Sequence, residues 1–349
     1  MRPSLSRRLL LGGFAGASLA TRGSFAAAAP ARTIGVGCWG GAFAAALDAV
    51  VAPPLLRNDH ITVRQVVSDE QDRVMRVVTP TPQTRLDVAL LSDTDAYRLS
   101  LAQLFVPVTT DGVRSLPRIL PGMRAPYGVP QSHTALCIVY DRARLHEAGL
   151  GRAPRSFEAM FKAAQHGKVG FSSELAIHNL AAAAIAQRSK SATLEAGKST
   201  FLSLKKSGAL RLYPTNDALG DALAKGEIVM APMWRARTYV WQQAGRDVRD
   251  SIPVEGLIPF SIVASVPKGV TDSRAAMLTL EELLHPETQV AIAKRTGLLP
   301  TVIDAHLDAA LQRRIGFTAF DRTHLRPLSL DAVARHGVAL RHFWDQELA

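Results

Sequence analysis

Three short stretches of the sequence place polar and aromatic side chains where a ligand could be bound. Trp39-Gly40-Gly41 and Ser92-Asp93-Thr94 each follow an apolar run and precede a segment with helical periodicity. Ser172-Ser173 stands at a similar junction, and Arg235 follows Trp234 directly. Helix amino termini and guanidinium groups suit carboxylate, phosphonate or sulfonate groups. These residues predict recognition of a small polar molecule, and a solvated helix face is the alternative for the arginine.

Signatures of catalysis are absent from the sequence. It has no G-x-S-x-G elbow, no H-E-x-x-H helix and no phosphate-binding P-loop. His133 stands beside Ser132 without an acidic partner nearby, and no metal-ligand spacing occurs. We therefore expect no enzymatic activity, no cofactor and no metal. An exported hydrolytic enzyme that uses His133 stays open as the alternative, because catalytic groups meet in space rather than along the chain.

Apolar strands alternate with amphipathic helices around these positions. Ile61–Val67 and Leu86–Leu91 have the pattern of strands, and Ser156 has that of a helix cap. Pro53-Pro54 predicts the end of the helix that begins near Phe43. Unbroken apolar strands between helices indicate an α/β fold with a sheet covered on both faces. In such sheets ligands bind beyond the carboxyl ends of the strands.

Residues 1–30 have the pattern of a twin-arginine export signal. Ser6-Arg7-Arg8 precedes Leu9-Leu10-Leu11, and the alanine cluster Ala26–Ala29 follows a stretch of small and apolar residues. We expect export to the periplasm and a mature chain that starts near Ala29 to Arg32. A basic amphipathic helix that is not cleaved is the alternative. Four arginines and no acidic residue lie in this segment, so its removal lowers the formal net charge from +11 to +7.

Composition indicates a globular chain with room for two lobes, since apolar residues make up 47% of 349 residues. Lysines and arginines are scattered among acidic residues, whereas nucleic-acid binding would require a concentrated basic stripe. Beyond the signal, no stretch is apolar and long enough to span a membrane. Cys38 and Cys137 both lie in apolar runs. Either a disulfide in an oxidising compartment or two small core residues would explain them.

Several motifs occur in an order that is more specific than any one of them alone. They are Tyr127-Gly128-Val129-Pro130, Pro154-Arg155-Ser156-Phe157-Glu158, Gly167-Lys168-Val169, Gly226-Glu227 through Met233-Trp234, Val266-Pro267-Lys268-Gly269, His285-Pro286-Glu287 and Gly297-Leu298-Leu299-Pro300. From about Thr33 to Thr301, this order resembles the extracellular solute-binding proteins of bacterial ABC importers. It is most similar to their spermidine/putrescine-binding branch.

The resemblance implies a type II periplasmic binding protein fold. Two α/β lobes, with parallel or mixed sheets flanked by helices, would be joined by two crossing strands near Val129–Val139 and Glu255–Val266. The implied division is 1–30 export signal, 31–130 first part of lobe 1, 131–256 lobe 2, 257–300 second part of lobe 1, and 301–349 a helical segment packed on the lobes. Such a protein, a monomer, would close on one solute and deliver it unaltered to an ABC permease in the inner membrane. A receptor subunit that reports to a sensor is another alternative.

The resemblance also implies which residues touch the solute. Trp39 and Trp234 match the tryptophans of the two lobes, Ser92 matches the strand-end serine, and Phe260 stands where another tryptophan is usual. Polyamine binders hold ammonium groups with aromatic faces and carboxylates. The full expected set is Trp39, Gly40, Ser92, Asp93, Ser132, His133, Ser172, Ser173, Trp234, Arg235, Glu255 and Phe260. Core packing is the alternative for both tryptophans.

Two departures from the polyamine pattern leave the ligand class open. Thr94 replaces an expected aromatic residue, and Ile262 replaces an expected aspartate. Asp93 and Glu255 would compensate for the lost charge, although Glu255 would equally serve as a structural residue of its Glu-Gly turn. A zwitterionic or anionic small molecule therefore competes with a diamine as the expected solute.

Overall fold

The strands of the computed structural model form one seven-stranded sheet and one two-stranded sheet. The structure describes residues 32–150, 153–187 and 193–348, so the predicted export signal lies outside the described residues. The large sheet has the order β2-β1-β3-β9-β4-β7, and β8 also pairs with β4. The seven strands are β1 (Arg32–Cys38), β2 (Ile61–Val67), β3 (Val88–Ser92), β4 (Val129–Asp141), β7 (Met230–Trp234), β8 (Val248–Ser251) and β9 (Ile258–Ser265).

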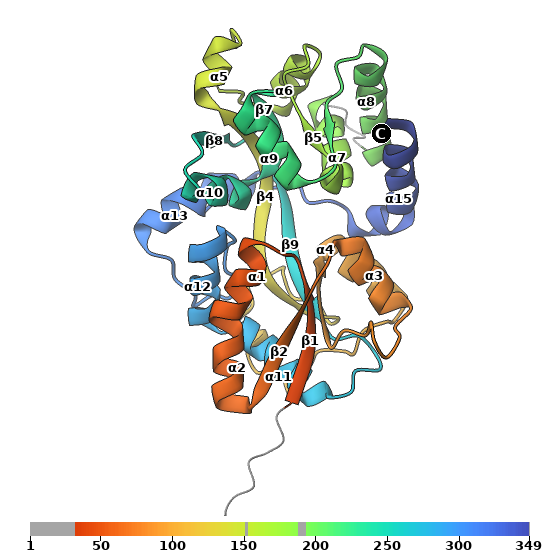
Figure 1. The fold of residues 1–349 in the computed structure, drawn as a ribbon, viewed down its shortest axis with the longest axis vertical. Helices are drawn as coiled ribbons and strands as arrows, with labels where there is room; N and C mark the ends of the chain where they lie inside the picture. The colour runs from red at the N-terminus through yellow and green to blue at the C-terminus, as the bar shows by residue number, and fades with distance from the viewer. Residues whose placement is uncertain (1–31, 151–152, 188–192, 349) are drawn as a thin grey trace, which may run out of the picture. The chain divides into compact units, whose positions relative to one another are not determined.

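Two long strands, β4 and β9, cross from one half of this sheet to the other. They are antiparallel, with a register that runs from Val129 opposite Ala264 to Leu136 opposite Ile258 (Figure 1). We call the elements around β1, β2 and β3 lobe 1, and those around β5 to β8 lobe 2. The predicted crossing strands are therefore confirmed. Where each lobe begins and ends along the chain stays a prediction.

Lobe 2 also contains the two-stranded sheet, in which β5 (Phe171–Ser172) and β6 (Leu212–Tyr213) are parallel. An isolated parallel bridge joins Val169 to Met230 of β7. In lobe 1, β1 is parallel to both β2 and β3. Each lobe thus has a parallel core of three strands whose carboxyl ends face the same way.

Helices flank both sheets and begin where side chains can cap them. Asp69, Ser92 and Ser156 each accept a hydrogen bond from the backbone N–H three residues later, at 2.8, 3.1 and 3.0 Å. The helices are α1 (Ala42–Ala46), α2 (Ala52–Asp59), α3 (Glu70–Val78), α4 (Asp93–Leu101), α5 (Arg142–Glu147), α6 (Phe157–Ala164), α7 (Ala176–Ala186), α8 (Gly197–Lys206), α9 (Asn216–Lys225), α10 (Arg235–Gln243), α11 (Ser273–Leu283), α12 (Pro286–Thr296), α13 (Ala309–Ile315), α14 (Ala319–Thr323) and α15 (Leu330–Phe343).

The helix predicted to end at Pro53-Pro54 instead continues to Asp59. A π-helical turn, Leu47–Val51, separates α1 from α2, and the two prolines occupy the first turn of α2. A proline lacks the N–H that a helix interior needs, but the first turn has no intrahelical acceptor for it. The wider π turn shifts the backbone hydrogen bonds so that the helical segment continues past the prolines. The prediction that the helix ends here is therefore wrong.

The two cysteines are free and fully buried. Cys38 ends β1 and Cys137 lies in β4, and the sheet order places β3 and β9 between these strands. Three strand spacings amount to roughly 14 Å, whereas a disulfide needs Cα atoms within about 7 Å. The alternative of two small core residues is therefore correct.

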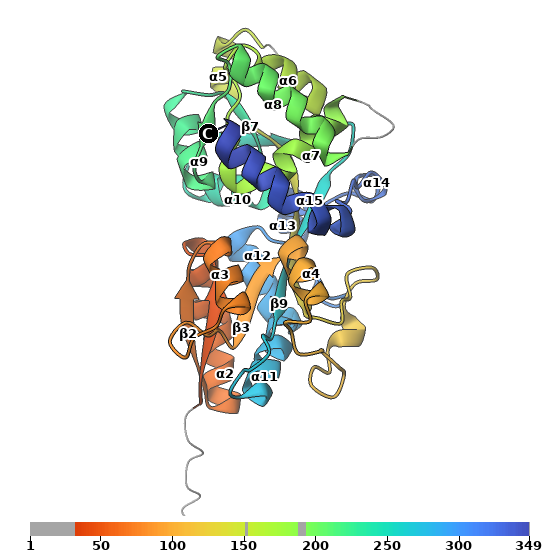
Figure 2. The ribbon, with the colours of Figure 1, turned by 90° about the vertical axis from the view of Figure 1, so that its right-hand side faces the viewer.

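The carboxyl-terminal helix α15 contacts both lobes. It packs against α4 of lobe 1 and α7 of lobe 2 (Figure 2). The Tyr97 hydroxyl on α4 donates a hydrogen bond of 2.5 Å to Asp331 Oδ1 at the start of α15. Within the described residues, no helix combines the length and apolar character required to cross a bilayer.

Candidate functional site

The candidate site is built from strand-to-helix turns at the carboxyl ends of the parallel strands. In lobe 1, β1 leads to α1, β2 to α3 and β3 to α4. In lobe 2, β5 leads to α7, β6 to α9 and β7 to α10. Trp39-Gly40-Gly41 and Ser92-Asp93-Thr94 occupy two of these turns, as predicted. Ligands of α/β proteins bind at such strand ends because the turns present free backbone groups and helix amino termini.

Strand register places residues from both lobes on one face of the crossing strands. Ser92 pairs with Ile262, which also pairs with Ser132. Phe260 lies two residues before Ile262, so its side chain shares that face. Trp234 joins the same face through Leu136, which pairs with both Trp234 and Ile258. Four predicted site residues, Ser92, Ser132, Phe260 and Trp234, thus lie on one face. Ile262, which pairs with Ser92 of lobe 1, and Phe260 are about 7 Å apart along β9.

An aromatic cluster forms the lobe 2 part of this face. The rings of Trp234 and Phe260 stack with centroids 4.6 Å apart and an interplanar angle of 23°. His178 of α7 points its ring edge-on at Trp234, with centroids 4.7 Å apart. The exposed fractions of Trp234 and Phe260 are only 9% and 8%, so both rings also pack into the core. Sequence reasoning missed His178, which stands in an alanine-rich helix without any motif.

Polar side chains surround this aromatic cluster at the β5 and β6 turns. Ser172 is fully buried, and its carbonyl accepts a hydrogen bond of 2.9 Å from Asn179 Nδ2. Ser173 instead forms hydrogen bonds with the carboxyl-terminal segment. Its hydroxyl accepts a bond of 3.1 Å from Trp344 Nε1, and its carbonyl accepts one from Arg341. Ser173 is therefore committed to packing, and Ser172 is the serine of this pair that belongs to the candidate site.

The lobe 1 tryptophan lies over a buried arginine. The guanidinium carbon of Arg73 stands 3.9 Å from the centroid of Trp39, within the range of a cation–π contact. Arg73 is fully buried on α3, donates from Nε to Leu90 O at 2.8 Å, and donates from Nη1 to Ser68 O. Burial lowers the pKa of this guanidinium, and the nearby Glu70 carboxylate opposes that effect. The sequence offered no signal for Arg73 beyond its place on an amphipathic helix.

Two carboxyl groups adjoin the strand-end serine. Glu70 accepts a hydrogen bond of 2.5 Å from the backbone N–H of Ser92. Burial and then the charge of Asp95 raise the pKa of Glu70. Asp93 accepts a bond of 3.1 Å from the N–H of Ser261 on β9, and burial raises its pKa to about 7. An ammonium group near these carboxyl groups would favour their ionised forms.

His133 and Arg235 lie on the opposite face of the crossing strands. His133 follows Ser132 on β4, so its side chain points to the other face of the strand. Its ring centroid is 6.4 Å from that of Phe317. The Arg235 guanidinium also lies over Phe317, at 5.5 Å, and pairs with Asp250 at 3.1 Å. Burial, with the charge of Arg322, lowers the pKa of His133 to about 4. We therefore leave both residues out of the site that we propose.

Glu255 has a structural role that the sequence left open. Its two carboxylate oxygens accept hydrogen bonds from the backbone N–H groups of Phe157 and Glu158, at 3.0 and 3.1 Å. These donors are the first two of α6, which a negative charge stabilises. Gly40, which follows Trp39 in the β1 turn, is exposed. Of the two, Gly40 stays with the candidate site and Glu255 belongs to the α6 cap.

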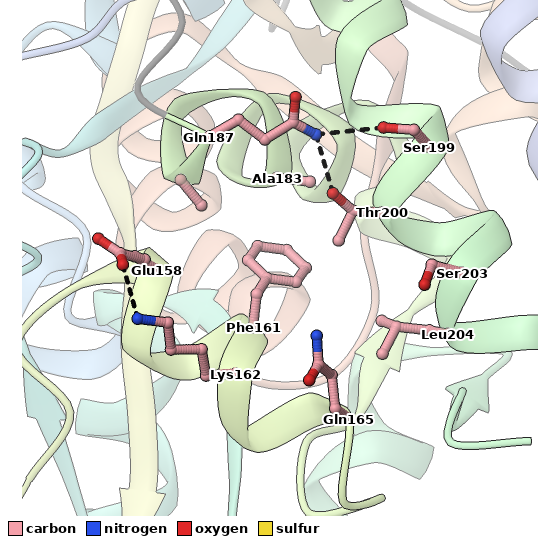
Figure 3. A pocket seen from close by; sticks show the side chains of 11 residues that line it. Glu158, Phe161, Lys162, Gln165, Ala183, Gln187, Ser199, Thr200, Ser203 and Leu204 are labelled. Carbon is pink, nitrogen blue, oxygen red and sulfur yellow. Dashed lines mark hydrogen bonds and ion pairs between the residues drawn. The ribbon is translucent and has the colours of Figure 1, made fainter. Parts of the chain in front are cut away.

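A groove with a volume of about 290 Å³ lies elsewhere on lobe 2, between α6, α7 and α8 (Figure 3). Gln187 donates hydrogen bonds to Ser199 and Thr200 at 3.3 and 2.9 Å there, beside the ring of Phe161. None of the predicted site residues lines it. In the described part of the chain, no cluster of three or more His, Cys, Asp or Glu side chains could hold a metal ion.

Comparison with known proteins gives the context of this geometry. The family described as bacterial extracellular solute-binding protein matches residues 56–319. No curated protein matches the chain significantly. The match to the family covers most of the chain and agrees with the prediction of a binding protein rather than an enzyme.

Solved structures with the same fold cover nearly the whole described chain. The Atu4243–GABA receptor has a TM-score of 0.77 at 18% identity, covering 91% of this chain and 98% of the other. An ABC transporter substrate-binding protein from Bradyrhizobium japonicum USDA 110 has a TM-score of 0.77 at 16% identity, with coverages of 91% and 100%. A protein described as a spermidine/putrescine ABC transporter from Listeria monocytogenes has a TM-score of 0.71 at 14% identity, with coverages of 90% and 99%. These likenesses confirm the predicted periplasmic binding protein fold.

Proposed function

Because the chain belongs to the bacterial extracellular solute-binding proteins, we propose that it is the substrate-binding component of an ABC importer. It captures a small polar solute between its two lobes and delivers it to a permease in the inner membrane. No bond of the solute is made or broken. The protein works as a monomer in the periplasm, to which the twin-arginine signal directs it.

One observation supports this function above the others. Strand register gathers Ser92 of lobe 1 and Phe260 and Trp234 of lobe 2 on one face of the crossing strands. A solute on this face lies beside both lobes, and closure would add contacts from the strand-to-helix turns of each lobe. Its binding energy therefore favours the closed form, which a permease can distinguish from the open one.

The side chains at this face favour a solute with an amino group. Trp39 and Trp234 supply one aromatic ring from each lobe, each with one face covered, by Arg73 and Phe260 respectively. Glu70 and Asp93 offer carboxyl groups beside Ser92. Two proteins of the same fold are named for GABA and for spermidine/putrescine, and these solutes carry amino groups. The alternative, an anionic solute bound by Arg235, is less well supported because the Arg235 guanidinium already pairs with Asp250.

Thermal unfolding with a panel of solutes tests the proposal. Diamines, amino acids, amino alcohols, phosphonates and sulfonates would be compared, since a solute that binds only the folded state raises the melting temperature. We expect a shift with an amine and unchanged compound after prolonged incubation. Consumption of the compound would instead support the exported hydrolase.

Two variants connect the shift to the site. Trp39→Ala should reduce it strongly, because the Trp39 ring lies at the lobe 1 turn. Phe320→Ala is the matched control, since Phe320 is an aromatic residue with 69% of its surface exposed. Equal shifts in the two variants would place the solute elsewhere.

A further inference from the structure

The β5 and β6 turns of lobe 2 carry buried polar atoms that have no hydrogen-bond partner among the described residues. Resting on the function proposed above, we propose that Ser172, His178, Asn179 and Asn216 form a neutral polar subsite for an uncharged hydroxyl or carboxamide end of the solute. The charged end of the same solute is held in lobe 1. Recognition is thus divided, with charge read by one lobe and neutral polarity by the other.

The four side chains each have a buried atom that lacks a hydrogen-bond partner among the described residues. These atoms are Ser172 Oγ, His178 Nε2, Asn179 Oδ1 and Asn216 Oδ1. Ser172 and Asn179 are fully buried, and the exposed fractions of His178 and Asn216 are 7% and 8%. An unsatisfied buried polar atom costs about 1–3 kcal/mol. Four such atoms at one place indicate that something outside the chain completes them.

Hydrogen bonds and register hold these residues at one end of lobe 2. Asn179 Nδ2 donates to the carbonyl of Ser172, which fixes the free atom of that amide as an acceptor. Ser172 pairs with Tyr213, and β6 leads directly to Asn216 at the start of α9. The backbone N–H of Asn216 donates to Glu174 at 2.9 Å, just after the β5 turn.

The subsite is continuous with the aromatic cluster. His178 directly precedes Asn179 on α7, and its ring lies edge-on to those of Trp234 and Phe260, with centroids 4.7 and 6.0 Å apart. The cluster thus joins the face that carries Ser92. A solute that lies on the Trp234 and Phe260 rings has one end near the β5 turn and the other near lobe 1.

The chemistry of the subsite is neutral and mixed. A serine hydroxyl and an imidazole can each donate or accept, and Asn179 contributes an acceptor. Burial lowers the pKa of His178 to about 4, so the ring is uncharged near pH 7. Charged groups beside these turns already have partners: Glu174 accepts from the backbone of Asn216, Arg341 donates to the carbonyl of Ser173, and Asp217 pairs with Arg237. A charged solute end would be buried here without a partner, which is costly.

Lobe 1 has the opposite character. Arg73 Nη2 is buried and has no hydrogen-bond partner among the described residues, and Glu70 and Asp93 lie at the neighbouring turns. These groups offer a charge partner to an ammonium or a carboxylate end. A solute with one charged and one neutral end therefore fits both lobes, whereas a solute charged at both ends fits only one.

Four compounds with the same four-carbon chain test this division. 4-Aminobutan-1-ol and 4-hydroxybutanoate each carry one charged end and one hydroxyl. 1,4-Diaminobutane and 4-aminobutanoate are charged at both ends. By calorimetric titration of the full exported chain, we expect at least one hydroxyl compound to bind tenfold more tightly than either doubly charged compound. Equal or tighter binding of a doubly charged compound overturns the inference.

Two variants sharpen the result. Asn216→Asp places a carboxylate in the subsite at a helix amino terminus, which tolerates negative charge. It should shift the preference at least tenfold toward 1,4-diaminobutane. The neighbouring Asp217→Asn, at an exposed position that pairs with Arg237, is the matched control and should leave the preference within twofold. Ser172→Ala should weaken the hydroxyl compound about tenfold, and its unliganded melting curve checks that it folds.

The outcomes separate this inference from the function on which it rests. Binding of a doubly charged compound alone, or preferences unchanged in both Asn216→Asp and Ser172→Ala, removes the neutral subsite and leaves a solute-binding protein. If no compound of these four or of the wider panel binds, the proposed function fails and the subsite fails with it.

Discussion

The two lobes present different chemistry at equivalent turns. In lobe 1 the turns carry ionisable groups, Glu70, Arg73 and Asp93, and their hydrogen bonds run to neighbouring strands. In lobe 2 they carry stacked rings and neutral polar atoms, several without partners among the described residues. Under the function that we propose, one repeated fold element would recognise two kinds of chemical group. The difference follows from side chains and not from the backbone.

The largest expected effect comes from the lobe 2 rings. Trp234→Ala removes a side chain that stacks on Phe260 and is 9% exposed. Loss of such a buried ring should lower the free energy of unfolding by about 3–5 kcal/mol, in addition to abolishing solute binding. Urea unfolding measures the first effect and calorimetry the second. Trp39→Ala is the lobe 1 counterpart, and an equal loss of stability in both variants would contradict the contrast between the lobes.

Acid should destabilise lobe 2 through His178. Its pKa is about 4 in the folded protein and near 6.5 in an unfolded chain. The unfolded chain therefore binds a proton first as the pH falls. Stability is present above pH 6.5 and declines between pH 6.5 and 4, by about 3 kcal/mol for this shift. Urea unfolding at several pH values checks this, and His178→Phe should remove about half of the decline, because burial also lowers the pKa of His133 to about 4. A variant that keeps the full wild-type slope would assign the effect to other groups.

Arg73 should matter for lobe 1 and leave lobe 2 unaffected. Arg73→Met keeps the length of the side chain but removes its cation–π contact with Trp39 and its hydrogen bond to Leu90. We expect the free energy of unfolding to fall by about 2 kcal/mol. Tryptophan fluorescence should report a changed environment of Trp39. Trp39→Phe is the background control, because a spectral change that persists there arises from another tryptophan.

The smallest effect is expected at Glu255, outside both sets of turns. Glu255→Gln keeps the shape but removes the negative charge that caps α6. A loss of about 1 kcal/mol in stability is expected, with solute affinity unchanged in calorimetry. Weakened binding at unchanged stability would return this residue to the site.

Much of the fold could be predicted because its signals are local. The apolar runs at β2 and β3 and the helix starts at Ser92 and Ser156 depend on residues close in sequence. Trp39 and Ser92 could be assigned to the site because strand ends are where such folds bind ligands. The π turn before Pro53 could not be foreseen, since the ladder shift that accommodates the prolines has no residue pattern of its own.

The rest of the site depends on which face a side chain occupies. Ser132 and His133 are neighbours in sequence, yet only Ser132 shares the face of Ser92, because strand residues alternate. Arg235 follows Trp234 but reaches Asp250 instead. His178 could not be found in an alanine-rich helix, since its role depends on Trp234 from a strand more than fifty residues later.

The contact of α15 with both lobes has a consequence for motion. Any hinge opening that parts α4 from α7 must detach this helix from one of them, and the Tyr97–Asp331 bond joins it to α4. If the lobes open as proposed, these contacts must break, and the carboxyl-terminal helix would then act as a clasp that favours the closed arrangement in the empty protein.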